Sequence, residues 1–327
     1  MTRDRWANRS VVVTGALGFI GSHFVEELAA RGADVLGLYR SEHRAVRDEL
    51  SAHDRVRLLP VDLLDERRLR QVFEHEASGA QTIVHCAALD GNAAYKRAHS
   101  AEILDANLRV ASNLLNCVRD FGVEDVTVLS SAEAYCGPTA SPAREDDARC
   151  RTVRSGENGY VLSKLITEIL AEQYRRQYGF GVHLVRPANV YGPRDSFDGP
   201  ASRVIPAMIA RAESGGEIEI WGDGQQTRSF VYVTDLVRAA LALVETGKFH
   251  SLNVTTDETV SMLDLARVVF SVTGRTARIH HKPAQPVGAP GAVLDTTRMR
   301  EVVDYTPRTL REGLEETVRW YRHRIGR

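Results

Sequence analysis

A chain of 327 residues has room for about two domains, and its 42 basic and 43 acidic side chains leave a formal net charge of −1. This balance gives no electrostatic drive toward nucleic acid or an anionic membrane surface, so we expect neither as a partner. We also expect no signal peptide and no membrane span, because no segment reaches ~18 consecutive apolar residues. The four cysteines lack CxxC spacing, which favours a reduced cytoplasmic protein, and no metal site is expected.

Short apolar segments alternate with longer amphipathic segments through the first half of the chain. Strands are predicted at residues 10–14, 34–39, 56–60, 82–86, 126–130 and 182–186, and helices at 19–31, from about 65, at 101–121 and at 160–178. The strands are rich in Val and Ile without polar alternation, which is typical of a parallel sheet buried on both faces. Strands that alternate with helices predict an α/β fold, a doubly wound parallel sheet of the Rossmann type.

After Pro187 the pattern changes, because proline and glycine divide the chain into short pieces. Residues 228–233 are again strand-like and precede a predicted helix at 235–245, and a final helix is predicted at 310–324. We therefore predict a Rossmann domain over residues 1–187, to which residues 228–255 return. Residues 188–227 and 256–327 would form a smaller, partly interleaved C-terminal domain.

Three glycines follow the first predicted strand and open the first predicted helix. Gly15, Gly18 and Gly21 have this spacing, and Phe19 and Ile20 begin the helix between them. Glycine allows the backbone to turn tightly and approach a pyrophosphate, and a helix N-terminus offers free N–H groups and the positive end of its dipole. The segment therefore predicts a dinucleotide site, with a tight strand–helix turn as the simpler alternative.

The ends of the next two strands bear on the choice of dinucleotide. A carboxylate at the end of the second strand usually accepts the ribose hydroxyls of NAD, but this strand ends at Arg40 and has no acid. Arg40 can pair with a 2′-phosphate through its planar fork, which favours NADP over NAD, or it can simply face solvent. After the third strand, Asp62 is a candidate for the adenine amino group or for a helix cap, and the adjacent Leu63 is assigned to the same site.

A tyrosine and a lysine are candidates for proton transfer. Tyr160 and Lys164 lie four residues apart on a predicted helix, so they share one face, and the chain has no other Tyr-x-x-x-Lys pair. A nearby ammonium favours the phenolate, so we expect it to lower the pKa of Tyr160 and make the phenol a base near neutral pH. Ser131 follows a strand end, where its hydroxyl can bond the same substrate oxygen, although serine is also common in turns.

The motifs, in this order, resemble the extended short-chain dehydrogenase/reductase family, in its nucleotide-sugar epimerase/dehydratase branch. The resemblance extends nearly over the whole chain, to Trp320. It is carried by the glycine pattern, His85-Cys86-Ala87-Ala88, Ser130-Ser131, Tyr160 with Lys164, Arg186-Pro187-Ala188-Asn189-Val190-Tyr191-Gly192-Pro193, and Trp221-Gly222-Asp223-Gly224 with Arg228. This motif set is specific for the family and says little about the reaction.

The resemblance implies a role for individual residues. Tyr160 would be the base, Lys164 would hold the nicotinamide ribose, and Ser131 would polarise the substrate oxygen. Asn107 matches the family's structural asparagine near the lysine and is also assigned to the cofactor site. The remaining implied contacts are Ala87 for the cofactor, Asn189 and Arg228 for the diphosphate of a nucleotide sugar, and Asp295 for its ribose. Residues 285–290 depart from the family, because they lack the arginine that many relatives use as a further diphosphate contact.

The same resemblance implies a homodimer. Relatives dimerise through a pair of helices that resemble the predicted helices at 101–121 and 160–178. The apolar side chains of the first helix would serve either this interface or the core; they are Ile103, Leu104, Val110, Leu114 and Leu115.

Glu133 bears on the reaction. Oxidation of a sugar at C4 creates a ketone that acidifies the neighbouring C5–H and C3–H, and Glu133 resembles the glutamate with which 4,6-dehydratases remove the C5 proton. Against dehydration stands Ala132, where such enzymes carry an aspartate or a small hydroxyl residue. We therefore expect C4 oxidation followed by C5 deprotonation by Glu133, in a 4,6-dehydratase or 5-epimerase. The alternatives are a 4-epimerase, a 4-ketoreductase and a catalytically silent cofactor-sensing protein.

Overall fold

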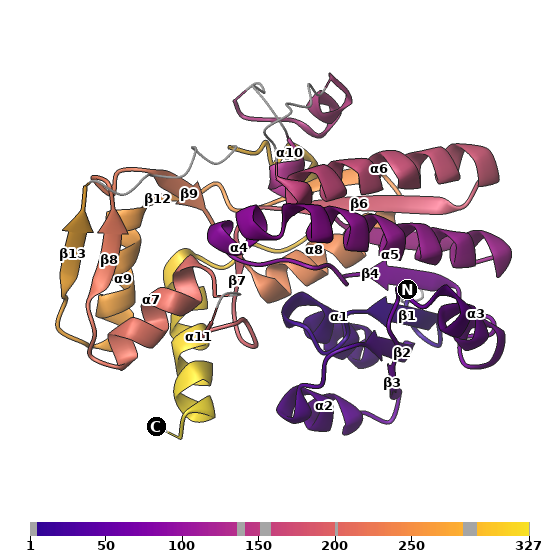
Figure 1. Cartoon of the computed structure of the whole chain (residues 1–327), viewed down its shortest axis with the longest axis horizontal. Helices are drawn as coiled ribbons and strands as arrows, with labels where there is room; N and C mark the ends of the chain where they lie inside the picture. The colour runs from indigo at the N-terminus through magenta and orange to yellow at the C-terminus, as the bar shows by residue number, and fades with distance from the viewer. Residues whose placement is uncertain (1–4, 136–140, 151–157, 200–201, 284–292, 327) are drawn as a thin grey trace.

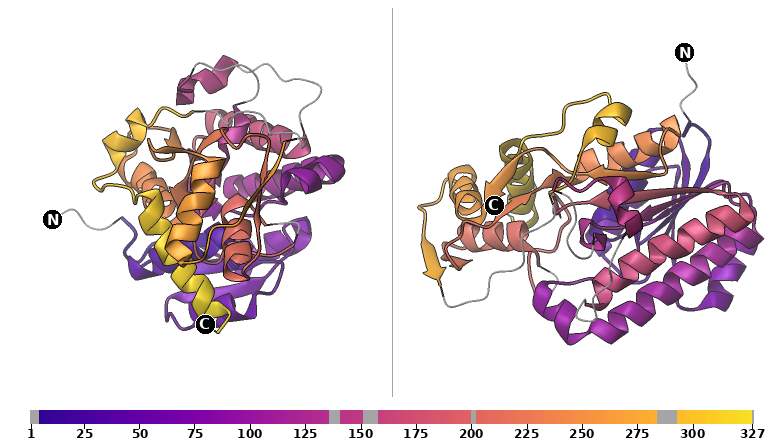
Figure 2. Two further views of the ribbon diagram at one scale, coloured as in Figure 1. Left: turned by 90° about the vertical axis from the view of Figure 1, so that its left-hand side faces the viewer. Right: turned by 90° about the horizontal axis from the view of Figure 1, so that it is seen from above.

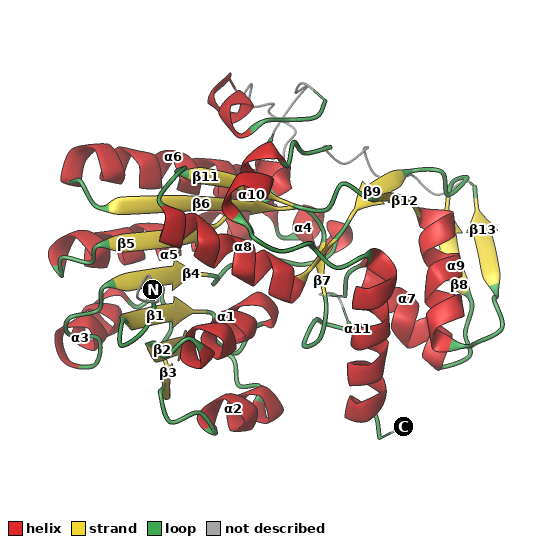
Figure 3. Cartoon of the chain, turned by 180° about the vertical axis from the view of Figure 1, so that it is seen from behind, coloured by secondary structure: helices red, strands yellow, loops and turns green. Residues whose placement is uncertain are grey.

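Seven parallel strands form the central sheet of the computed structural model, which describes residues 5–135, 141–150, 158–199, 202–283 and 293–326. The strand order is β11-β6-β5-β4-β1-β2-β3, and Figure 3 shows the strands stacked in this order from top to bottom. Their bounds are β1 Ser10–Thr14, β2 Asp34–Tyr39, β3 Val56–Pro60, β4 Thr82–His85, β5 Asp125–Leu129, β6 Gly181–Pro187 and β11 Ser251–Val254. The sheet is therefore the doubly wound, Rossmann-like α/β sheet that the sequence predicts.

Helices cover both faces of this sheet, and each face has its own core. Alternate residues of a strand point to opposite faces, so Val11 and Val13 pack in one core while Val12 packs in the other. The helices of the first face are α1 Phe19–Ala30 and α8 Val233–Thr246, and those of the second are α3 Glu66–His75, α5 Ser100–Asp120 and α6 Gly159–Tyr178. Figure 2 shows α5 and α6 running side by side along the second face.

The chain returns to the sheet after leaving it at β6. Helix α8 packs against α1, and β11 pairs in parallel with β6, so that Asn253 lies opposite Arg186. The single strand predicted at 228–233 is wrong, because this segment forms two short strands. The first, β9 Thr227–Ser229, pairs antiparallel with β12 Thr259–Ser261. The second, β10 Val231–Tyr232, pairs in parallel with β7 Val190–Tyr191. The domain boundaries themselves stay a prediction.

A third core lies beside the carboxyl ends of the sheet strands, in the region with the labels α7, α9, α11, β8 and β13 in Figure 1. Its elements are α7 Val204–Glu213, β8 Ile218–Trp221, α9 Met262–Thr273, β13 Ile279–Lys282 and α11 Leu310–Arg324. Shorter elements complete the fold: α2 Arg44–Ser51, α4 Ala93–Ala98, α10 Thr297–Val302 and the 3₁₀ helices η1 Ala132–Ala134 and η2 Glu145–Cys150. Residues 285–290, which depart from the family pattern, lie outside the described residues.

Within the described ranges, no helix combines the length and the hydropathy needed to cross a membrane. In the same part of the chain, no three His, Cys, Asp or Glu side chains gather as they would around a metal ion. Cys86 and Cys117 are free thiols, and burial raises the pKa of Cys117 to about 12.

Candidate active site

The main cavity lies where the strand order reverses between β1 and β4, at the carboxyl ends of the strands. This is the place where doubly wound sheets bind their ligands. The cavity has a volume of about 770 Å³ and is lined by the glycine turn, the loops after β4 and β5, and the first turns of α6 and α7. A neighbouring cavity of about 220 Å³ continues past the ends of β2 and β3.

The glycine turn leaves no room for side chains. A Cβ atom at Gly21 would lie 2.2 Å from the Gly15 carbonyl oxygen, and one at Gly15 would lie 3.0 Å from the backbone of Ala87. Gly15 also has a φ of +67°, which favours glycine. Helix α1 begins at Phe19 without a side-chain cap, and its first residues, Phe19, Ile20 and Gly21, line the main cavity. These features fit a dinucleotide pyrophosphate.

The smaller cavity is lined by several of the residues predicted to bind the cofactor. Arg40, Asp62, Leu63 and Asn107 all line it, and Arg40 is exposed at the end of β2. The Asp62 carboxylate accepts a hydrogen bond from the backbone N–H of Leu64 at 3.0 Å. The helix-cap alternative for Asp62 is wrong, because Asp65 is the residue that caps α3.

Hydrogen bonds and close backbone packing fix the N-terminus of helix α6. The Asn158 side chain accepts hydrogen bonds from the N–H groups of Tyr160 and Val161, and the Gly159 N–H donates to the Ser100 hydroxyl at 2.7 Å. A Cβ at Gly159 would lie only 1.7 Å from the Ser100 carbonyl oxygen, so glycine allows α5 and α6 to touch here. This contact fixes the direction in which Tyr160 points.

Asn107 connects α5 and α6 to the loop after β4. Its side chain exchanges hydrogen bonds with both the N–H and the carbonyl of Leu89, and its amide also donates to the Ser163 hydroxyl at 3.1 Å. Ser163 donates in turn to the Tyr160 carbonyl. The asparagine is therefore structural, as the resemblance implied, and it also borders the smaller cavity.

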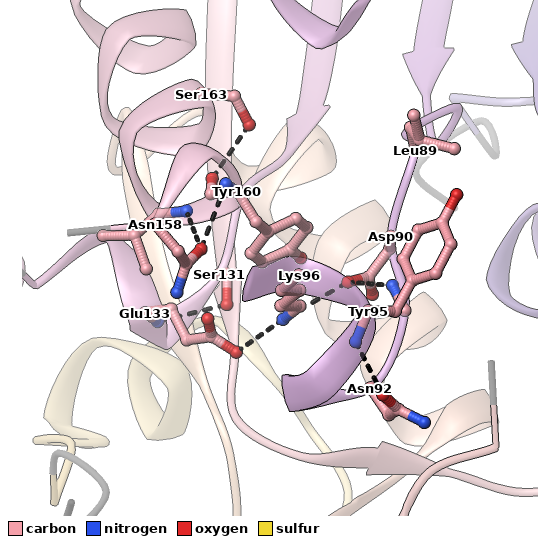
Figure 4. A network of polar contacts seen from close by, with 12 residues as sticks. Leu89, Asp90, Asn92, Tyr95, Lys96, Ser131, Glu133, Asn158, Tyr160 and Ser163 are labelled. Carbon is pink, nitrogen blue, oxygen red and sulfur yellow. Dashed lines mark hydrogen bonds and ion pairs between the residues drawn. The ribbon is translucent and has the colours of Figure 1, made fainter. Parts of the chain in front are cut away.

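Ser131, Tyr160 and Lys164 come together as the sequence predicts. The Lys164 ammonium lies 5.6 Å from the centre of the Tyr160 ring and donates to the Leu129 carbonyl oxygen at 2.7 Å. The Ser131 hydroxyl accepts a hydrogen bond from the Glu133 N–H at 3.1 Å, and its proximity to the Tyr160 phenol tends to lower the pKa of Tyr160. Figure 4 shows Tyr160 and Ser131 on the same side of the cavity, with Glu133 beside them.

The sequence predicts a lowered pKa for Tyr160, but the structure gives a raised pKa. Its pKa is raised well above 10, first by burial and then by the nearby carboxylates of Asp90 and Glu133, and only partly opposed by Arg203 and Ser131. Burial lowers the pKa of Lys164. The Tyr160 phenol therefore carries its proton at neutral pH.

Lys96 is the functional residue that the sequence analysis missed. It projects from the short helix α4, its side chain is 11% exposed, and its ammonium lies 3.7 Å from the centre of the Tyr160 ring. It forms ion pairs with Glu133 at 2.9 Å and with Asp90 at 3.2 Å (Figure 4). One signal was present in the sequence, since only four of the 42 basic residues are lysines and two of these four face this cavity.

The loop that carries Ser131 and Glu133 is held by a buried ion pair beneath it. Arg186 binds both carboxylate oxygens of Glu168 at 2.9 and 3.0 Å, and the Ser130 hydroxyl donates to the same carboxylate. Arg186 also donates to the Tyr135 hydroxyl at the other end of the loop. A bidentate pair of this kind fixes geometry as well as charge.

The predicted substrate contacts divide into two groups. Asn189 lines the main cavity, where its amide donates to the Ser229 carbonyl at 2.8 Å. Arg228 does not line this cavity and donates to the Thr227 carbonyl, and Asp295 borders a separate cavity of about 190 Å³, where its carboxylate accepts from the Thr297 N–H. Arg203, which the sequence did not indicate, lines the main cavity and pairs with the buried Asp195 at 2.9 Å.

The family model described as "NAD dependent epimerase/dehydratase family" matches residues 11–255. The chain belongs to this family. It is an enzyme of the nucleotide-sugar epimerase/dehydratase group, and the catalytically silent alternative is set aside. A "dTDP-4-dehydro-6-deoxy-D-allose reductase" from Streptomyces bikiniensis is 59% identical over 323 residues, covering 99% of both chains. A protein of the same name from Streptomyces sp is 58% identical and covers 98% of this chain and 99% of its own.

Solved structures of the epimerase/dehydratase family have the same fold. The UDP-glucose 4-epimerase of Thermotoga maritima, solved with UDP-glucose, is 28% identical with a TM-score of 0.84, covering 97% of this chain and 99% of its own. The dTDP-glucose 4,6-dehydratase of Streptomyces venezuelae, solved with NAD bound, is 26% identical with a TM-score of 0.84, covering 97% and 98%. Together with the glycine turn, these likenesses support a nicotinamide dinucleotide as the cofactor.

Proposed function

We propose that this enzyme is a 4-ketoreductase that reduces a dTDP-4-keto-6-deoxyhexose at C4. The observation that carries the proposal is the 59% identity, over 99% of both chains, to the Streptomyces bikiniensis protein named as a dTDP-4-dehydro-6-deoxy-D-allose reductase. This likeness favours the ketoreductase alternative over the 4,6-dehydratase or 5-epimerase that Glu133 suggested. The 4-epimerase alternative has its support in more distant likenesses only.

The protonation state of Tyr160 supports the same direction of reaction. A ketone that becomes an alcohol needs a proton at its oxygen, whereas an alcohol that is oxidised needs a base. Burial and the carboxylates of Asp90 and Glu133 raise the pKa of Tyr160, so the phenol carries its proton at neutral pH. A phenol that carries its proton can donate it to a ketone oxygen.

In the proposed mechanism, each polar group of the cavity has one task. NADPH, when bound against the glycine turn, supplies the hydride for C4. Tyr160 donates its proton to the ketone oxygen, and Ser131, which lines the same cavity, orients that oxygen. Lys164 lies near the resulting phenolate and stabilises its charge, and Asn189, which lines the same cavity, binds the substrate.

The loop between Ser131 and Glu133 lacks one group that dehydration requires. The residue between them is Ala132, which can protonate no leaving oxygen. Glu133 is held in an ion pair by Lys96 at 2.9 Å instead of standing alone beside the substrate. Both features favour simple reduction over chemistry at C5.

We propose NADPH in preference to NADH as the reductant. Arg40 lies at the end of β2 and lines the adenosine cavity, where a carboxylate would be expected for NAD. Its guanidinium is suited to a 2′-phosphate. Asp62 and Leu63, in the same cavity, are proposed as contacts of the adenine ring.

We also propose a cytoplasmic homodimer that associates through α5 and α6. Ile103, Leu114 and Leu115 are buried within one chain, so they belong to the core and not to an interface. The apolar side chains that α6 exposes include Ile166 at 38% and Ile169 at 52%, and a second copy would cover these two. Sedimentation of the purified protein, compared with an Ile166→Asp/Ile169→Asp variant, tests this assembly.

The function is tested by incubating the enzyme with a dTDP-4-keto-6-deoxyhexose and NADPH and analysing the product by mass. Reduction consumes one NADPH per product and adds two hydrogens. Loss of one water from a dTDP-hexose would instead favour the 4,6-dehydratase, and a new isomer of unchanged mass without net NADPH consumption would favour an epimerase. Either of these results overturns the proposal.

A further inference from the structure

We propose that Lys96 is a positioning residue that keeps Glu133 ion-paired, so that the enzyme reduces the ketone without removing protons from the adjacent sugar carbons. This inference rests on the proposed function, because it concerns a 4-keto substrate. It assigns opposite tasks to two residues of one cavity: Tyr160 gives a proton to the ketone oxygen, and Glu133 is prevented from taking one from carbon.

The geometry of Lys96 carries the proposal. Its side chain is 11% exposed, and the ammonium contacts the Glu133 carboxylate at 2.9 Å, the Asp90 carboxylate at 3.2 Å and the face of the Tyr160 ring at 3.7 Å from its centre. An ammonium has three N–H donors, and the Lys96 ammonium contacts two carboxylates and the face of one aromatic ring. Glu133 is 47% exposed, so the position of its carboxylate is set by Lys96 more than by packing.

The backbone around Lys96 is arranged to bring the ammonium to this point. Helix α4 is a single short helix whose first turn is capped by Asn92, which accepts from the N–H groups of Ala94 and Tyr95 at 3.0 and 2.9 Å. Asp90 precedes this helix and bonds the N–H of Gly91 at 2.8 Å, so the carboxylate that meets Lys96 is itself fixed. Figure 4 shows Lys96 between Glu133 on one side and Asp90 on the other.

The ion pair opposes a defined side reaction. A ketone at C4 acidifies the hydrogens of C3 and C5. If Glu133 removed one of them, its carboxylate would gain the proton, the carbon–hydrogen electron pair would become an enolate on the ketone oxygen, and return of a solvent proton could invert the carbon. Proton uptake would neutralise Glu133 and abolish its pair with Lys96, so the pair disfavours the first step. Reduction then proceeds with the neighbouring stereocentres intact.

Hydrogen exchange in heavy water tests this inference without using the reduction reaction. The 4-keto sugar is incubated in D₂O with enzyme and NADP⁺, and deuterium at C3 and C5 is followed by NMR. The wild type is expected to exchange no faster than the enzyme-free solution. Lys96→Met, which keeps a long side chain without charge, is expected to raise the exchange rate by about fivefold, the size of a moderately exposed ion pair.

Three further variants make the test specific. Lys96→Met/Glu133→Gln is expected to lose the added exchange, because the proton acceptor is gone. Lys96→Arg is expected to restore the wild-type rate, since a guanidinium can pair with Glu133, and Asp90→Asn is expected to leave it unchanged, since it keeps the Lys96–Glu133 pair. Should Lys96→Met fold poorly, as judged by circular dichroism, Lys96→Gln replaces it in the same comparison.

The outcomes separate this inference from the proposed function. If the wild type reduces the 4-keto sugar with NADPH while Lys96→Met shows no added exchange, or shows exchange that persists with Glu133→Gln, the role of Lys96 is wrong and the function stands. If the wild type exchanges as fast as Lys96→Met, the inference is also wrong. If the wild type consumes no NADPH with the 4-keto sugar, the proposed function itself fails.

Discussion

The two sides of the active-site cavity are built in different ways. The cofactor side consists mainly of backbone: a glycine turn with no space for a Cβ atom and the uncapped start of α1, both from one short segment. The substrate side consists of charged and polar side chains from distant segments, with Lys96 on α4, Glu133 on η1 and Tyr160 on α6. The first side depends on close packing, and the second depends on the mutual positions of charges.

This difference predicts where a substitution changes binding and where it changes chemistry. On the cofactor side a single added carbon should weaken dinucleotide binding and leave the proton-transfer groups in place. On the substrate side the removal of a single oxygen or charge should leave cofactor binding unchanged and alter turnover. The following substitutions test that separation, beginning with the largest effect.

Tyr160→Phe should lower kcat by about a thousandfold, because it removes the proposed proton donor and keeps the ring against which Lys96 packs. The affinity for NADPH should not change, which fluorescence titration of the bound cofactor measures. Tyr95→Phe is the matched control, since the Tyr95 hydroxyl points away from Tyr160 in Figure 4, and it should keep its activity. A Tyr160→Phe enzyme that retains more than about a tenth of kcat would exclude Tyr160 as the donor.

Gly21→Ala should weaken NADPH binding by about ten- to a hundredfold, the effect of overpacking a tight contact. The added Cβ would lie 2.2 Å from the Gly15 carbonyl oxygen, so the turn must move away from the phosphates. Gly216→Ala, in the loop between α7 and β8, is the control, because Gly216 lines neither the main cavity nor the smaller cavity. Equal affinities of the two variants for NADPH would contradict the role of the glycine turn.

The same contrast explains what could be predicted from the sequence. The strands around the glycine turn are continuous apolar runs, so β1, β2 and β3 were predicted to the residue, and the turn itself has a contiguous glycine pattern. Tyr160 and Lys164 were found because their spacing on one helix is local information. Such patterns can be recognised in a single sequence because the interacting groups are close along the chain.

The substrate side could not be predicted in the same way. Helix α4 has six residues, too few for a periodic pattern, and the pairing of Lys96 with Glu133 joins residues 37 positions apart. The pKa of Tyr160 was predicted in the wrong direction for a related reason, since burial and the carboxylate of Asp90 depend on the folded arrangement and outweigh the local effect of Lys164. The reaction was expected from Glu133 beside Ser131, Tyr160 and Lys164, without the ion pair that Glu133 forms with Lys96.

Arg40→Ala should reduce the affinity for NADPH by about tenfold, because a charge-assisted contact to the 2′-phosphate is lost at an exposed position. The affinity for NADH should stay the same, so the ratio of the affinity for NADPH to the affinity for NADH should decrease. Arg44→Ala removes a neighbouring arginine that does not line the adenosine cavity and serves as the control. An equal loss for both cofactors, measured by kcat/KM, would argue against recognition of the phosphate.

The smallest effect is expected beneath the glycine turn, where two buried histidines make stability depend on pH. Burial lowers the pKa of His85 to about 3 and that of His23 to about 4, so both are neutral in the folded protein. The unfolded chain binds their protons below pH ~6.5, so stability falls as the pH falls through that value toward ~3.

His85→Asn should therefore flatten this acid dependence. Between about pH 7 and pH 5, one such histidine accounts for about 2 kcal/mol of lost stability, which urea unfolding at each pH measures. The variant should lose stability less steeply than the wild type, even if its stability at neutral pH is lower because the contact between His85 and the Thr14 hydroxyl at 2.9 Å is changed. His75→Asn, with a side chain that is 73% exposed, should follow the wild-type slope. If the free energy of unfolding of all three proteins fell equally with pH, His85 would take up its proton without unfolding. The cofactor side of the cavity would then be less closely packed than its glycine contacts indicate.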